Sequence, residues 1–127
     1  MFGMLVDKLE KAIEQDKKKP NLGLIDIEKV KELYKNGALI LDVRPVGKVE
    51  GKNVEEAGIK NAYYIPITDI TKHLDKLPKD KEAPIITTCK LVKFANRAMG
   101  YLEALGYTNV YVFDGSTPEL IEALSNQ

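Results

Sequence analysis

The residue best suited to covalent chemistry is Cys89, the only cysteine among the 127 residues. It directly follows the strand-like run 84–88, and a helical pattern begins a few residues later, near Phe94. A loop between a strand and a helix can point several backbone N–H groups at one sulfur, with the helix dipole adding to their effect. Such a loop lowers the thiol pKa from about 8.5 and favours the thiolate. Lys90 and Lys93 place positive charge beside this candidate nucleophile.

Alternating strand and helix patterns surround this loop. Four short apolar runs predict strands buried on both faces: residues 38–41, 62–65, 85–88 and 110–113. Helical patterns follow the later runs: residues 67–77, 94–105 and 118–124, the last capped by Thr117. This alternation predicts an α/β fold, a central parallel sheet with helices on both faces. Ligands of such sheets bind beyond the carboxyl ends of the strands, where Cys89 is expected.

Two further helices precede the first of these strands. The first has an apolar stripe formed by Phe2, Leu5, Val6, Leu9 and Ile13, and it ends before Pro20. Asp26 is expected to cap the second helix, which ends at residues 36–37. We therefore divide the chain into an extra N-terminal amphipathic helix and linker, 1–20, and a domain, 21–127. The first helix is expected to pack on its own domain, although its stripe could also meet a second copy or a partner.

Composition excludes several classes of function. Nineteen basic and nineteen acidic residues give a formal net charge of zero, so no global field attracts nucleic acid or anionic membranes. One cysteine and one histidine, His73, cannot supply the paired ligands of a zinc site. No apolar run approaches the ~20 residues of a membrane span. Since a lone cysteine forms no internal disulfide, we expect a cytoplasmic protein without a metal or cofactor.

A series of short motifs occurs in a characteristic order. The series comprises Ile25-Asp26-Ile27-Glu28, Leu41-Asp42-Val43-Arg44, Gly58-Ile59-Lys60-Asn61-Ala62, Ile65-Pro66, the strand ending at Cys89, and Leu102-Glu103-Ala104-Leu105-Gly106-Tyr107. Over about the last hundred residues this order resembles the rhodanese-like sulfurtransferase family, of the single-domain type.

The resemblance implies a fold, an activity and a site. In this family a cysteine takes a sulfane sulfur from a donor such as thiosulfate or a persulfide, and passes it to a thiol or cyanide. It implies Cys89 as nucleophile, with Asp42 and Arg44 bracing the site as an ion pair. The implied partners are a small anionic donor, the acceptor, and a sulfur-carrier protein as a further candidate. The implied anion-binding loop consists of Lys90, Leu91, Val92, Lys93, Phe94 and Ala95.

The loop also departs from the family pattern, so alternatives stay open. No glycine is present, and Val92 would be strained if its φ had to be positive. Phe94 replaces a basic residue, and Gly58 stands where the family has histidine. The alternative is a catalytically weak or inactive rhodanese-like binding or sulfur-carrier module. A cysteine phosphatase is disfavoured because Ala95 occupies the position of its phosphate-binding arginine, and Arg97 lies within the next helix.

Overall fold

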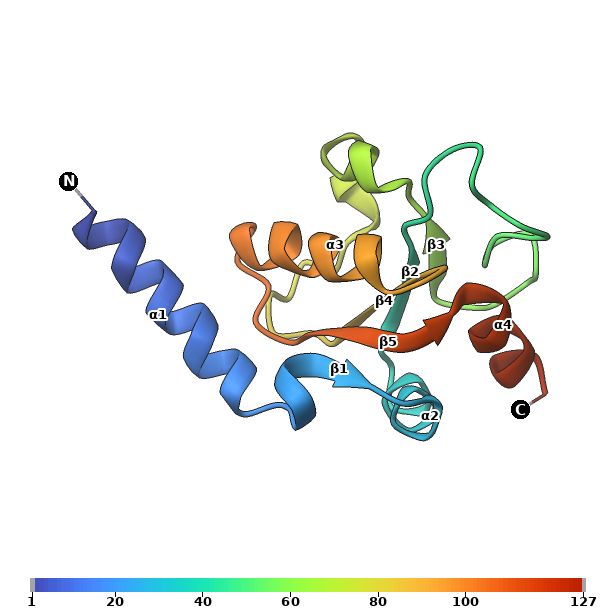
Figure 1. The fold of residues 1–127 in the computed structure, drawn as a ribbon, viewed down its shortest axis with the longest axis horizontal. Helices are drawn as coiled ribbons and strands as arrows, with labels where there is room; N and C mark the ends of the chain where they lie inside the picture. The colour runs from blue at the N-terminus through green and yellow to red at the C-terminus, as the bar shows by residue number, and fades with distance from the viewer. Residues whose placement is uncertain (1, 127) are drawn as a thin grey trace.

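The five-stranded sheet at the centre of the computed structural model is entirely parallel (Figure 1). The model describes residues 2–126, and the strand order is β1-β5-β4-β2-β3. The predicted α/β architecture is therefore confirmed. The strands are β1 (Leu24–Ile25), β2 (Leu39–Asp42), β3 (Ala62–Tyr64), β4 (Ile85–Cys89) and β5 (Val110–Ser116).

Helices cover both faces of the sheet. The α-helices are α1 (Gly3–Lys17), α2 (Ile27–Lys35), α3 (Lys93–Ala104) and α4 (Thr117–Ser125). Three short 3₁₀-helices connect other elements: η1 (Pro20–Gly23), η2 (Ile67–Lys72) and η3 (Leu74–Lys76). The side chains of α3 and η2 pack in one apolar cluster, and those of α2 and α4 pack in the other.

Strand periodicity explains how one sheet supports two cores. Successive side chains of a strand point to opposite faces. Ile85 accordingly joins the cluster beneath α3, whereas Ile86 joins the cluster beneath α2 and α4. Ile85 and Ile86 are both fully buried, as expected for a parallel sheet covered on each face. Cys89 lies at the carboxyl end of this central strand.

Three local predictions need correction. Residues 67–77 form two 3₁₀-helices instead of an α-helix; the buried pair Ile67 and Ile70 has the three-residue repeat of a 3₁₀-helix. Ser116, not Thr117, is the cap of α4: its side chain accepts the Glu119 N–H in a capping box. Thr117 is buried instead. The two-residue strand β1 had no periodic pattern of its own and was not predicted.

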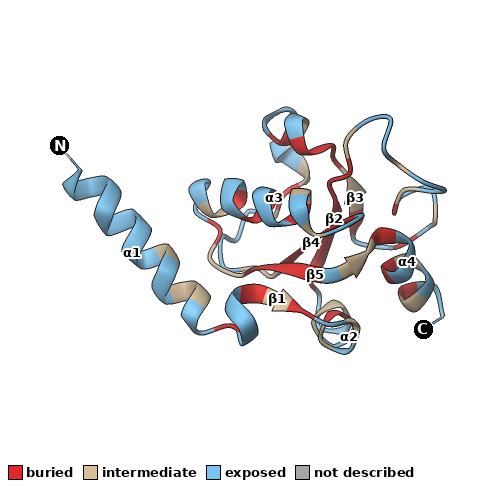
Figure 2. Ribbon diagram, in the orientation of Figure 1, coloured by how far each residue is buried: buried red, intermediate tan, exposed pale blue. Residues whose placement is uncertain are grey.

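The N-terminal helix differs from the expectation that it packs on the domain. The structure confirms a helix at α1, but none of the residues from Gly3 to Lys17 is buried (Figure 2). The helix extends away from the sheet and touches the rest of the molecule near its carboxyl end (Figure 1). The outermost residues of the predicted segments, Met1 and Gln127, lie outside the described residues. Within 2–126, no helix is both long and apolar enough to span a membrane.

Candidate active site

Cys89 ends β4 directly below the first turn of α3. Its side chain is 1% exposed and belongs to the apolar cluster beneath that helix. The backbone N–H of Ala95 donates a hydrogen bond to Cys89 Sγ at 3.2 Å. Several amides of residues 90–95 were expected to converge on the sulfur; within residues 2–126, Ala95 makes the one hydrogen bond to it. The structure therefore places the sulfur at the N-terminus of α3 and closes it from solvent.

A buried hydroxyl fixes the position of that donor. Thr87 Oγ1 donates to the Ala95 carbonyl at 3.0 Å and also lies 3.0 Å from the Tyr111 carbonyl. The first turn of α3 is thereby tied to β4, since Thr87 lies two residues before the cysteine. Thr88 makes a second buried contact, 3.0 Å between its hydroxyl oxygen and that of Thr117. No sequence pattern singled out these threonines, because a strand pattern does not distinguish a packing residue from a hydrogen-bonding one.

Val92 holds the most strained backbone of the loop. It directly precedes α3 with φ +75° and ψ −34°. The left-handed region is unfavourable for a β-branched residue, so the condition for strain set out from the sequence is met. The Val92 carbonyl accepts the Asn96 N–H at 2.8 Å, and its half-buried side chain packs against the core. These contacts hold the conformation in place.

The two lysines predicted beside the sulfur have different surroundings. Lys90 Nζ donates to Glu50 Oε1 at 2.7 Å, and this hydrogen bond lowers the pKa of Glu50. Lys93 Nζ lies 5.4 Å from the centre of the Phe94 ring. An anion that binds Lys90 must compete with the Glu50 carboxylate, whereas Lys93 has no such competitor among the described ion pairs. Leu91, between them, is 78% exposed.

Asp42 and Arg44 form the ion pair that the sequence predicted. Arg44 Nε and Nη2 donate to the two carboxylate oxygens of Asp42, at 2.9 and 2.7 Å. Both side chains are buried, and the bidentate geometry satisfies the carboxylate. The remaining donors of Arg44 reach the carbonyls of Glu50 at 3.1 Å and Lys52 at 3.0 Å. The pair thus fastens the irregular segment 46–58, and Glu50 connects that segment to Lys90.

Glu50, like Thr87 and Thr88, is a residue near the site that the sequence did not indicate. It lies in the longest irregular connection of the chain, and its distance of 40 residues from Lys90 hides the contact. The opposite charges of Glu50 and Lys90 were the only feature of the sequence that could have suggested their contact. His73, in contrast, lies at the end of η2, and no group of metal-binding side chains occurs within residues 2–126.

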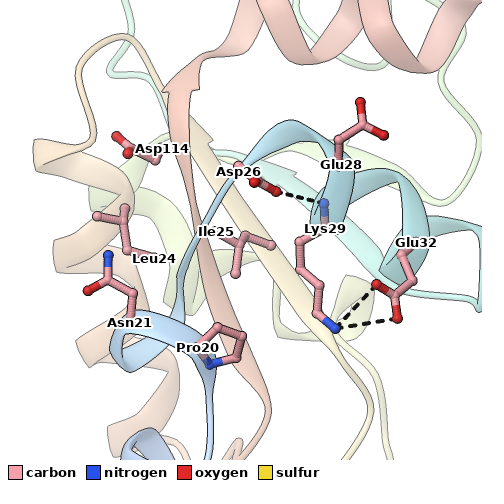
Figure 3. A pocket seen from close by; sticks show the side chains of 9 residues that line it. All are labelled: Pro20, Asn21, Leu24, Ile25, Asp26, Glu28, Lys29, Glu32 and Asp114. Carbon is pink, nitrogen blue, oxygen red and sulfur yellow. Dashed lines mark hydrogen bonds and ion pairs between the residues drawn. The ribbon is translucent and has the colours of Figure 1, made fainter.

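A surface hollow lies away from Cys89. It encloses about 550 Å³ between η1, β1 and α2 (Figure 3). Asp26, Lys29, Glu32 and Asp114 are among its lining residues, and Cys89 is not. Lys29 donates to the Asp26 side chain through its backbone and to Glu32 through its ammonium group. Asp26, Lys29 and Glu32 thus pair with one another, so we seek the chemistry of the molecule at Cys89.

Comparisons with known proteins agree with this geometry. A family model described as rhodanese-like domain matches residues 6–123. A search of curated proteins finds no match. Two short solved structures are similar: a rhodanese homologue of Thermus thermophilus (26% identity, 73% of this chain, 94% of the other, TM-score 0.52) and a human single-domain sulfurtransferase (22%, 79%, 96%, TM-score 0.58).

A larger protein contains a similar unit. The reduced CoADR-RHD of Bacillus anthracis is 23% identical over 81% of this chain, with a TM-score of 0.59. The chain spans only 17% of that protein. The family model covers nearly the whole sequence. The chain belongs to the rhodanese-like domain family.

Proposed function

We propose that this chain is a sulfurtransferase in which Cys89 carries a sulfane sulfur. The observation that carries the proposal is the position of Cys89 Sγ, at the carboxyl end of β4 and 3.2 Å from the first-turn N–H of Ala95. A helix N-terminus stabilises negative charge on a thiolate, and on the persulfide formed from it. The similarity to solved sulfurtransferases supports the same assignment.

The transfer proceeds in two displacements. The Cys89 thiolate attacks the outer sulfur of thiosulfate; the new S–S bond forms as the donor's S–S bond breaks, and sulfite leaves with the electron pair. The acceptor, cyanide or a thiolate, then attacks the terminal sulfur of the persulfide, and Cys89 departs as a thiolate. The second step forms thiocyanate or a new persulfide. A protein persulfide or a sulfur-carrier protein can replace thiosulfate or the acceptor in the same scheme.

The loop between β4 and α3 provides the route to the sulfur. Because Cys89 is 1% exposed, a donor reaches it only when residues 90–92 move aside. Two of these residues, Lys90 and Leu91, are exposed and therefore lack the packing that would hold them. Lys93 remains available to attract an anionic donor to the opening.

Intact-mass spectrometry of the folded protein tests the proposal. Treatment with thiosulfate or polysulfide should add the mass of one sulfur atom, and cyanide should remove it as thiocyanate. The variant Cys89→Ser should retain the wild-type thermal melting temperature and gain no sulfur. An unmodified wild-type mass, in a sample whose thiol reacts with an alkylating reagent after denaturation, would contradict the proposal.

A non-catalytic rhodanese-like binding module is the second candidate. The complete burial of Cys89 favours it, because a binding module needs no access to the sulfur. Such a protein would fold cooperatively while its native thiol stays unreactive toward both donors and alkylating reagents. The rate of alkylation of native Cys89, measured alongside the mass shift, separates the two candidates.

A further inference from the structure

The N-terminal helix exposes an apolar stripe that the domain leaves uncovered. Its side chains recur every three or four residues, which places them on one face of α1. They are Phe2, Leu5, Val6, Leu9 and Ile13, exposed by 66, 60, 44, 60 and 47%. Figure 2 shows the helix exposed along almost its whole length. A continuous apolar surface of this kind marks an interaction site.

A buried junction fixes the direction of the helix. Lys19 is 7% exposed, and its ammonium group donates to Asp16 Oδ1 and to the Val110 carbonyl, each at 2.9 Å. Glu103 of α3 lies 3.8 Å from the same ammonium group. Residues 21–23 then take positive φ angles of 48°, 55° and 97°, which turn the chain into β1. Lys19 and the turn at residues 21–23 therefore form a joint that holds α1 pointing away from the sheet (Figure 1).

The charges of the helix favour a second copy of this chain as the occupant. The helix has four acidic and three basic residues, so it lacks the polybasic face that anionic membranes attract. Lys8 and Glu10 are about 200° apart around the helix and border the stripe on opposite sides. In a parallel pair with twofold symmetry, opposite sides meet, and Lys8 of each copy lies beside Glu10 of the other. In an antiparallel pair centred on Leu9, like charges would meet.

We propose that α1 pairs in parallel with α1 of a second copy to form a dimer. Leu5 and Leu9 of one copy pack against the same residues of the other, and two Lys8–Glu10 ion pairs flank this seam. A standard interface buries about 800 Å² on each partner, more than one helix of 15 residues offers. The dimer is therefore expected to be weak, with a dissociation constant in the micromolar and not the nanomolar range.

Sedimentation velocity of the full chain tests the pairing at concentrations from about 1 to 500 µM, which span the expected dissociation constant. The wild type should change from monomer to dimer, and Leu9→Glu should remain a monomer. Met4→Glu is the matched control: Met4 is 77% exposed but lies about 140° around the helix from Leu9, and this variant should still dimerise. Neither substitution should lower the melting temperature of the domain, because both positions are exposed.

Charge exchange and crosslinking test the orientation. Lys8→Glu and Glu10→Lys should each weaken dimerisation severalfold, and the double variant should restore it. In a Cys89→Ser background, Leu5→Cys should form a disulfide-linked dimer on oxidation, because Leu5 meets its own copy only in a parallel pair. A monomer at every concentration, crosslinking by Leu9→Cys without Leu5→Cys, or cosedimentation of monomers with vesicles of phosphatidylcholine and phosphatidylserine would overturn the proposal.

Discussion

Val92 adopts a backbone conformation that glycine tolerates better than other residues. Its φ of +75° carries a strain of about 1–3 kcal/mol for a β-branched side chain. The side chain partly offsets this strain by packing against the core. The strain can be measured by comparing two substitutions that both remove the packing of Val92 but differ in how easily their backbone adopts a positive φ.

Val92→Gly and Val92→Ala provide that comparison. Both remove the valine contacts, but only glycine adopts a positive φ without strain. We expect Val92→Gly to be more stable than Val92→Ala by about 1 kcal/mol, the reverse of the usual order in a helix or strand. Urea denaturation measures the difference. The ordinary order, with alanine more stable, would mean that the loop relaxes to a negative φ.

At the scale of elements, the side chain of Arg44 ties the segment 46–58 to the end of β2. Arg44 neutralises buried Asp42 and donates to the carbonyls of Glu50 and Lys52. Loss of one partner leaves the other charge buried without compensation. The stability of the sheet end and the order of this segment are therefore coupled through Arg44.

Asp42→Asn should lower the free energy of unfolding by about 3–5 kcal/mol, because Arg44 then lacks its buried counter-charge. Arg44→Met should cost a similar amount and should also speed proteolytic cleavage within 46–58. The double variant Asp42→Asn/Arg44→Met should be less destabilised than the sum of the two. Chemical denaturation and limited proteolysis measure these effects, and simple additivity would mean that the two residues act independently.

The elements that were predictable from sequence have local signals. Asp26 accepts the Lys29 N–H as a helix cap, and α2 ends at Lys35 with Asn36 as its C-cap, where the Asn36-Gly37 stop was predicted. Short apolar runs likewise marked four of the five strands. The signals failed where tertiary packing decides: β1 has two residues paired with β5, and η2 and η3 replace one expected helix.

In the candidate site, too, some features have a local sequence signal and others depend on tertiary packing. The position of Cys89 after a strand follows from the pattern along the chain, and the pairing of Asp42 with Arg44 was implied by the family resemblance. The burial of the sulfur, the single Ala95 donor and the Lys90–Glu50 contact depend on how distant segments pack. No periodicity encodes such contacts, so they could not be predicted from one sequence.

On the scale of the whole molecule, the joint between α1 and the domain contains a carboxyl with an altered pKa. Burial, followed by the neighbouring Asp16 carboxylate, raises the pKa of Glu103 from 4.5 to about 8, while Lys19 opposes the shift. Glu103 Oε2 is buried and has no hydrogen-bond partner among residues 2–126. Because the folded state binds this proton more tightly than the unfolded chain, stability is fully present below pH 4.5 and falls as the pH rises toward 8.

Glu103→Gln should remove this dependence. Below about pH 4.5 the variant and the wild type should have similar free energies of unfolding. Above about pH 8 the variant should be more stable by on the order of 1 kcal/mol, since the partly exposed carboxyl is screened by solvent. Chemical denaturation between about pH 4 and 9 measures the two profiles, with exposed Glu122→Gln as control. Parallel profiles for wild type and Glu103→Gln would show that Glu103 titrates normally.

Cys89 is the one thiol in these 127 residues, which limits how a sulfur atom carried on it could be released. Enzymes with a resolving cysteine expel sulfur by closing an internal disulfide, and this sequence has no second sulfhydryl for that purpose. Under the proposed function, a protein loaded with sulfur on Cys89 would therefore keep it until an external acceptor arrives. With a single thiol, each chain would hold one sulfane sulfur at a time in the proposed reaction.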